Sequence, residues 1–167
     1  MFYFDILKAF YQMKVKYLIT GGLAVNLFGV PRVTHDLDVI LSMDEGNILL
    51  VLKILNKLGY KPRLPVDPKE LLDEQKVENW IQNKNMFAFS FCQPENEYQV
   101  LVILIHHPLD FEKSFEKKVV KTAKNIDICL VAMDDLILMK EFSGRDQDLS
   151  DISLLRKARE FMGQDND

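Results

Sequence analysis

The chain has 167 residues, of which 48% are hydrophobic and 28% are charged. This balance is that of a folded globular protein and excludes an intrinsically disordered chain. The net charge of −4 argues against a protein whose main ligand is nucleic acid, because such proteins need a basic face. The apolar runs are too short to cross a bilayer, and two cysteines are typical of free thiols in a reducing compartment. We therefore expect a cytoplasmic protein without a membrane partner.

Hydrophobic periodicity predicts alternating helices and strands in the first half of the chain. Ser42 and Glu45 have the spacing of a capping box, which predicts that a helix begins there. The predicted elements are a helix over 2–13, a buried strand over 15–20, a helix over 23–28, a strand over 36–41 and a helix that ends near residue 58.

The second half is richer in hairpin patterns. Its predicted elements are a polar helix over 69–83, strands over 86–92 and 98–105, a short helix over 111–117, hairpin strands over 119–123 and 126–131, and closing helices over 134–142 and 149–161. Together the elements predict an α+β fold in which helices flank a mixed sheet. We expect one domain over residues 1–162 and a disordered tail over 163–167, which has nothing to bury.

A pair of glycines closes the first predicted strand. Gly21 and Gly22 let the backbone approach a ligand without interference from a Cβ atom. The amide hydrogens that begin the next helix then face the same point and favour an anion. Taken alone, the pair also fits an ordinary turn.

Two carboxylates open the second predicted strand. Asp36 and Asp38 lie at positions i and i+2, so both side chains point to one face, with Cα atoms roughly 6 to 7 Å apart. Adjacent carboxylates disfavour each other's ionisation unless a cation neutralises them. Oxygen ligands of this kind suit Mg²⁺, with Mn²⁺ as an alternative. The other interpretation is a solvated strand end.

These motifs together resemble the signature of the nucleotidyltransferase superfamily, whose fold is shared with DNA polymerase beta. The glycine pair is separated by thirteen residues from Asp36-Leu37-Asp38-Val39, as in that signature. Two further segments resemble a small bacterial branch related to the AbiEii toxins. They are Arg32-Val33-Thr34-His35 and, near the end of the chain, Asp135 to Lys140 with Gly144 to Asp151.

The resemblance implies metal-dependent transfer of a nucleoside monophosphate from a nucleoside triphosphate to an acceptor hydroxyl. Asp36 and Asp38 would hold the metal ions, and the acceptor stays open between RNA, a protein and a small molecule. The implied branch also adds a cognate protein as a partner. The residues implied at the triphosphate are Gly21, Gly22, Arg32, Thr34 and Lys140.

Several of these roles have structural alternatives. Arg32 and Thr34 either touch phosphate or shape the turn before the second strand. Lys140 either approaches the triphosphate or is a solvated lysine on a helix. Arg145 and Asp148 are more simply explained as a structural pair.

One expected acid is missing. The family carries a third carboxylate on a later strand, and alignment from Leu109 places it at Leu101, where residues 99–105 contain no acid. The alternative function is therefore an impaired nucleotidyltransferase fold that binds nucleotide or acts as a toxin–antitoxin regulatory module. His106 and His107 end that strand and point to opposite faces, so we interpret them as ordinary histidines rather than as ligands of one metal.

Overall fold

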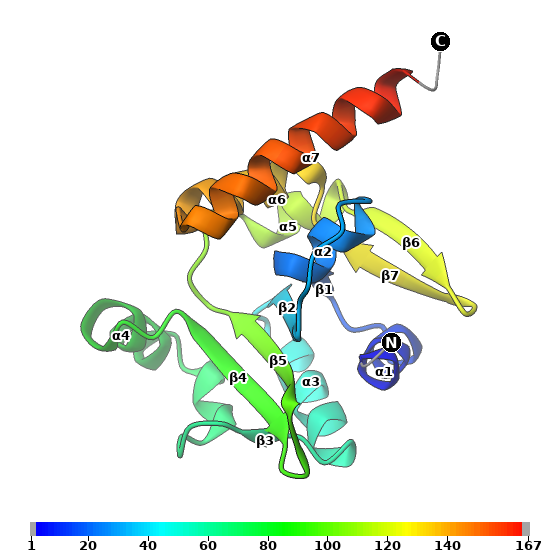
Figure 1. The fold of residues 1–167 in the computed structure, drawn as a ribbon. Coiled ribbons are helices and arrows are strands. Elements are labelled where there is room, and N and C mark those ends of the chain that lie inside the picture. The colour runs from blue at the N-terminus through cyan, green and yellow to red at the C-terminus, as the bar shows by residue number, and fades with distance from the viewer. Residues whose placement is uncertain (1–2, 165–167) are drawn as a thin grey trace.

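The computed structural model describes residues 3–164 of the chain. Within this range the strands form one seven-stranded mixed sheet in the order β3-β4-β5-β2-β1-β7-β6, with helices around it (Figure 1). The predicted α+β class is therefore confirmed. No helix of the described residues is long and apolar enough to cross a membrane.

The first half of the chain supplies the centre of the sheet. Its elements are α1 (Phe4–Gln12), β1 (Tyr17–Ile19), α2 (Gly21–Leu27), β2 (Asp36–Leu41) and α3 (Glu45–Lys57).

The second half supplies both edges of the sheet and the closing helices. Its elements are β3 (Lys61–Pro62), the 3-10 helix η1 (Pro68–Leu72), α4 (Glu74–Lys84), β4 (Ala88–Gln93), β5 (Asn96–Leu104), α5 (Phe111–Glu116), β6 (Val119–Ala123), β7 (Ile126–Leu130), α6 (Met133–Ser143) and α7 (Asp146–Gln164).

Strand β2 lies in the middle of the sheet. It pairs with β1 in antiparallel and with β5 in parallel orientation. The two predicted hairpins, β4–β5 and β6–β7, both form antiparallel pairs. In the register of β2 and β5, Leu37 is opposite Leu101 and Asp38 is opposite Val102. Because aligned residues of neighbouring strands share a face, this register decides which side chains of β5 accompany the two aspartates.

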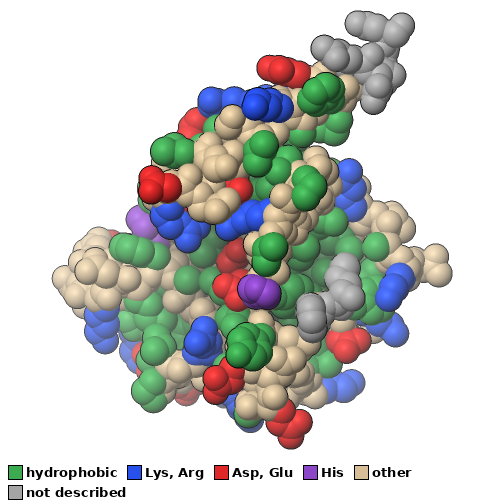
Figure 2. All heavy atoms as spheres, in the orientation of Figure 1, with side chains coloured by type: hydrophobic (Ala, Val, Ile, Leu, Met, Phe, Trp, Pro, Cys, Tyr) green, Lys and Arg blue, Asp and Glu red, His purple; other side chains and the backbone are tan. Residues whose placement is uncertain are grey.

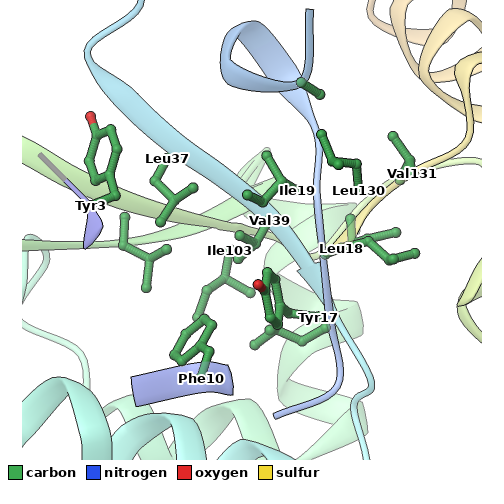
Figure 3. Close-up of a cluster of buried hydrophobic side chains, with 14 of the residues drawn as sticks. Tyr3, Phe10, Tyr17, Leu18, Ile19, Leu37, Val39, Ile103, Leu130 and Val131 are labelled. Atoms are coloured by element: carbon green, nitrogen blue, oxygen red, sulfur yellow. The ribbon is translucent and has the colours of Figure 1, made fainter. Parts of the chain in front are cut away.

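The main core lies against the face of β2 that carries Leu37 and Val39 (Figure 3). Phe10 of α1 and Tyr17 of β1 pack in this core with their ring centroids 5.1 Å apart. Ile103 of β5 is buried beside them. Burial of these large side chains anchors β2, and the alternation along the strand turns Asp36 and Asp38 to the opposite face.

Several local predictions need correction. The capping box at Ser42 is wrong, because Asp44 is the N-cap of α3 and its carboxylate accepts a hydrogen bond from the amide of Asn47 at 2.9 Å. The Ser42 hydroxyl instead donates to Asp44 at 2.7 Å. The single helix predicted over 69–83 is divided at Asp73, whose carboxylate caps α4 by accepting from two amides.

The end of the chain is more helical than expected. Helix α7 begins at Asp146 and runs to Gln164, so the first two residues of the predicted disordered tail belong to it. Residues 165–167 and residues 1–2 lie outside the described residues, and these include Phe2, the start of the first predicted helix. Figure 1 shows α2, α6 and α7 gathered at one end of the sheet, where β1 and β5 end.

Candidate functional site

The two carboxylates of β2 differ in their surroundings. Asp36 is exposed at the start of the strand, whereas Asp38 is largely buried. Burial, and after it the negative charge of Asp36, raise the pKa of Asp38 to about 6 against the opposing effects of Lys140 and Arg145. The backbone amide of Gly22 donates a hydrogen bond to the Asp38 carboxylate. Asp38 therefore ionises reluctantly unless another cation approaches it.

The glycine turn fits closely around this carboxylate. Gly21 has a left-handed backbone with φ of +62°, and a Cβ atom there would collide with the Asp38 carboxylate. A Cβ atom on Gly22 would lie 2.7 Å from the Thr34 hydroxyl oxygen, which is too close. Neither position admits a larger residue without movement, so the two glycines bring the start of α2 against the aspartates.

Five charged side chains behind the turn form one network, whose centre, Lys140 with Asp148 and Asp151, is buried. The Lys140 ammonium donates to Asp148 at 3.0 Å and to Asp151 at 2.7 Å. Arg32 donates to the same oxygen of Asp151 at 2.6 Å. Arg145 donates through Nε to Asp148 at 2.8 Å. The network ties α6 and α7 to the loop that leads into β2, because its members come from all three segments.

Burial excludes one of the two interpretations of Lys140. Its side chain is only 4% exposed, so the interpretation as a solvated lysine is wrong. Burial by itself would raise the pKa of Asp148, but hydrogen bonds from Arg145 and Lys140 outweigh it and hold that pKa far below its usual range. The predicted pairing of Arg145 with Asp148 is confirmed. Asp148 is therefore ionised at neutral pH.

Hydrogen bonds hold both the backbone and the side chain of Arg32, which lies in the loop before β2. The Asn26 side chain accepts from the Arg32 amide at 2.7 Å and donates to the Arg32 carbonyl at 2.9 Å. Asp151 binds the Arg32 guanidinium but was not among the residues predicted for the site. A signal for it exists, because Asp148 and Asp151 are three residues apart on one helix and so share a face.

All seven residues that the sequence predicts for the site line one cavity of about 670 Å³. On the face in Figure 2, acidic side chains lie next to basic ones at the centre of the molecule. The seven predicted residues are Gly21, Gly22, Arg32, Thr34, Asp36, Asp38 and Lys140.

Strand β5 carries no acidic residue on the face that borders the cavity. Val102 and Leu104 line the cavity, whereas Leu101 is fully buried on the opposite face with Leu37. The prediction that Leu101 takes the place of the third carboxylate is therefore wrong by one residue. The position beside Asp38 is Val102, and it is also apolar.

Aromatic rings close the cavity beyond β5. The His106 ring lies between Phe87 and Phe142, with 5.1 Å between centroids in each pair. His107 also lines the cavity, and burial lowers the pKa of its ring. Within residues 3–164, no three His, Cys, Asp or Glu side chains are grouped so as to hold a metal ion. The carboxylate pair fits Mg²⁺ all the same, because this ion takes one or two carboxylates and completes its shell with water and phosphate oxygens.

Comparisons with known proteins agree with this geometry. Residues 5–157 match a family described as "Nucleotidyltransferase of unknown function (DUF6036)". No curated protein is significantly similar to the chain. The match concerns the superfamily and does not bear on the AbiEii-related branch.

Solved structures share the fold at low sequence identity. A lincosamide antibiotic adenylyltransferase, LnuA, bound to lincomycin has a TM-score of 0.61 at 20% identity, over 94% of this chain and 96% of that one. The antibiotic-resistance factor ANT(2″)-Ia in complex with adenylyl-2″-tobramycin has a TM-score of 0.57 at 12% identity, over 93% and 86%. An antigenic nucleotidyltransferase-like protein from Paracoccidioides brasiliensis has a TM-score of 0.51 at 16% identity, over 90% and 71%.

Proposed function

Because the chain belongs to the family described as nucleotidyltransferases of unknown function, we propose that it transfers a nucleoside monophosphate from a nucleoside triphosphate to an acceptor hydroxyl. The observation that carries this proposal is the pair Asp36 and Asp38, held against the Gly21-Gly22 turn in one cavity. The reaction takes place in the cytoplasm under this proposal.

The residues of the chain have distinct roles in this proposal. Asp36 and Asp38 are the metal ligands. Burial and the negative charge of Asp36 raise the pKa of Asp38, so a cation bound between them would favour its ionised form. The chemistry that a bound Mg²⁺ or Mn²⁺ supplies is polarisation of the α-phosphate and neutralisation of the leaving pyrophosphate. The Gly21-Gly22 turn and the Thr34 hydroxyl lie beside the triphosphate in this proposal, and the Gly22 amide donates to Asp38.

The three cations of the network differ in how they can contribute to phosphate binding. Lys140 uses two of its three N–H donors on Asp148 and Asp151, so one donor is left for a phosphate oxygen. Arg145 is 70% exposed at the rim of the cavity and is the guanidinium most able to turn toward a phosphate. Arg32 is held by Asp151 and orients the loop into β2.

The structural neighbours favour a small molecule as the acceptor over RNA or a protein. LnuA is bound to lincomycin and ANT(2″)-Ia to an adenylylated tobramycin, and both share this fold. The acidic net charge of this chain also speaks against an RNA acceptor.

The test is nucleotide binding followed by pyrophosphate release. We expect calorimetry to detect binding of one of the four ribonucleoside triphosphates in Mg²⁺, and a panel of acceptors to yield pyrophosphate. Asp36→Asn and Asp38→Asn should abolish both signals, whereas Glu97→Gln, an exposed change in the β4–β5 hairpin, should leave them unchanged. Failure of all four triphosphates to bind would refute the proposal.

A second function is favoured by Val102, the apolar residue beside Asp38. A site without the third carboxylate fits a module that binds nucleotide but does not turn it over, and the AbiEii resemblance adds a cognate protein partner to this alternative. Triphosphate binding with no pyrophosphate release across the acceptor panel would favour it. Steady release with any one acceptor would rule it out.

A further inference from the structure

The two sides of β2 present different chemistry to the cavity. On the β1 side lie the glycine turn and the basic network of Arg32, Lys140 and Arg145. On the other side lies β5, whose residues at the cavity are Val102 and Leu104. The two aspartates stand between a polar half and an apolar half.

The geometry of the proposed reaction indicates which half of the cavity binds the leaving pyrophosphate and which binds the acceptor. In a displacement at phosphorus, the attacking oxygen and the leaving oxygen lie roughly in line on opposite sides of the α-phosphate. The leaving pyrophosphate requires amide and cationic donors, which occur on the β1 side. The acceptor hydroxyl therefore approaches over β5.

The β5 half is built as an apolar and aromatic wall. Val102 and Leu104 form its floor. Phe87 and Phe142 stand on either side of His106, and their side chains are 47% and 50% exposed. Flat rings that remain half exposed at a cavity offer a stacking surface for a planar group.

The charges of the cavity limit what can lie on this wall. Its acidic residues are the metal pair and Asp148, which is fully buried and bonded to Lys140. Of the described residues that line the cavity, each Lys or Arg already binds a buried aspartate. A polycation would find no carboxylate on the β5 half, and a polyanion would find no cation there.

We propose that the acceptor is a neutral, hydroxyl-bearing small molecule with a planar apolar face, which stacks on the wall formed by Phe87, Val102, Leu104, His106 and Phe142. This deepens the proposed function and rests on it. The acceptor oxygen forms a bond to the α-phosphorus while the bridging α–β P–O bond breaks. That electron pair leaves with pyrophosphate, and the hydroxyl proton passes to solvent.

The test uses 7-hydroxy-4-methylcoumarin, a planar neutral phenol, with the full chain, Mg²⁺ and α,β-methylene ATP. We expect saturable coumarin binding by ligand-detected NMR. Phe87→Ala and Phe142→Ala should each weaken it by about tenfold, since each removes a ring from the stacking surface. Phe161→Ala is the matched control, because this exposed ring lies far along α7 and away from the cavity residues. Tobramycin and a short oligoribonucleotide serve as the polycationic and polyanionic probes.

Three results would overturn the inference while α,β-methylene ATP still binds. One is no saturable coumarin binding, and another is tighter binding of tobramycin or of the oligoribonucleotide. The third is complete displacement of coumarin by the ATP analogue, which would assign the wall to the nucleobase. If the ATP analogue itself does not bind, the proposed function fails, so the two failures are distinguishable.

Discussion

The substitution Val102→Asp places a carboxylate beside Asp38, where the register of β2 and β5 puts the two residues opposite each other. The new side chain points into the cavity, because Val102 already lines it. We expect this variant to be less stable than the wild type without metal. We also expect it to bind Mg²⁺ more tightly, since a third carboxylate adds both a ligand and a negative charge.

The magnitude follows from the strand spacing. Paired strands lie about 5 Å apart, and two unit charges at that distance repel by about 3 kcal/mol in an effective dielectric constant of about 20. The pKa of Asp38 is already raised to about 6, so part of this cost is relieved by protonation below that pH. The destabilisation should therefore be largest above pH 6 and should disappear when Mg²⁺ is added.

Leu101→Asp is the matched control, one residue away. Its side chain would face the core, where Leu101 is fully buried opposite Leu37. Loss of the leucine costs about 2 kcal/mol, and a carboxyl group in that place has its pKa raised by about 3 to 5 units, equivalent to about 4 to 7 kcal/mol. The sum is comparable with the whole stability of a domain, roughly 5 to 15 kcal/mol, and Mg²⁺ cannot reach the group to offset it.

The assay is urea unfolding of both variants, with and without Mg²⁺, followed by circular dichroism. We expect the midpoint of Val102→Asp to rise with Mg²⁺ by more than that of the wild type, while Leu101→Asp is mostly unfolded in either condition. If Leu101→Asp folds normally and responds to Mg²⁺ while Val102→Asp does not, the register of β5 and the reasoning built on it are refuted.

Three further predictions concern the aspartates, the network and the turn. The pKa of Asp38 is about 6 against an ordinary 3.8, so ionisation of Asp38 lowers the stability of the fold as pH rises from about 4 to about 6. The variant Asp38→Asn should therefore recover at most about 3 kcal/mol of unfolding free energy at pH 7. Metal-free urea titrations of this variant should also show a flatter dependence of stability on pH. Lys140→Met leaves two buried aspartates without their shared cation and should cost about 3 to 5 kcal/mol of stability. Arg145→Ala, at an exposed position, should cost about 1 kcal/mol. Chemical unfolding measures both losses, and equal losses would contradict the reasoning. Gly21→Ala should abolish triphosphate binding in calorimetry, while Gly29→Ala, also at a positive φ but in open space, should cost only about 1 to 2 kcal/mol of stability and leave binding intact.

The parts of the site that depend on neighbours in sequence could be predicted. Alternation along one strand is enough to place Asp36 and Asp38 on one face. The glycine pair ends the first predicted strand and is separated by thirteen residues from Asp36. This spacing is that of the nucleotidyltransferase signature, which implies that the turn lies against the second strand. Both features need only local geometry, and both lie in the cavity.

The parts that depend on long-range register could not. Leu101 and Val102 are equally apolar, and the pairing of β5 with β2, more than sixty residues away in sequence, decides which of them faces Asp38. Composition and periodicity carry no information about that register. A shift of one residue exchanges the two faces of a strand, which is why the position of the missing acid was misplaced.

Local competition explains the error at the start of α3. Ser42 and Glu45 have the capping-box spacing, but Asp44 is an equally good N-cap and lies closer to the first turn. The Ser42 hydroxyl donates to the Asp44 carboxylate, while Asp44 accepts from the amide of Asn47 and so occupies the cap position. Both residues are strong cap formers, and their order in the chain alone does not decide between them.

The charges around the cavity predict that the proposed binding of metal and the proposed binding of nucleotide depend on each other. The network and the metal pair together contain three cations and four carboxylates, a net charge of minus one without metal. A triphosphate is repelled by such a site. The negative charge of Asp36 also adds to the burial that raises the pKa of Asp38 to about 6. One divalent cation reverses the net charge, so metal and triphosphate stabilise each other there. Under the proposed function, the network holds the site in shape and offers donors to phosphate, while the metal supplies the net positive charge.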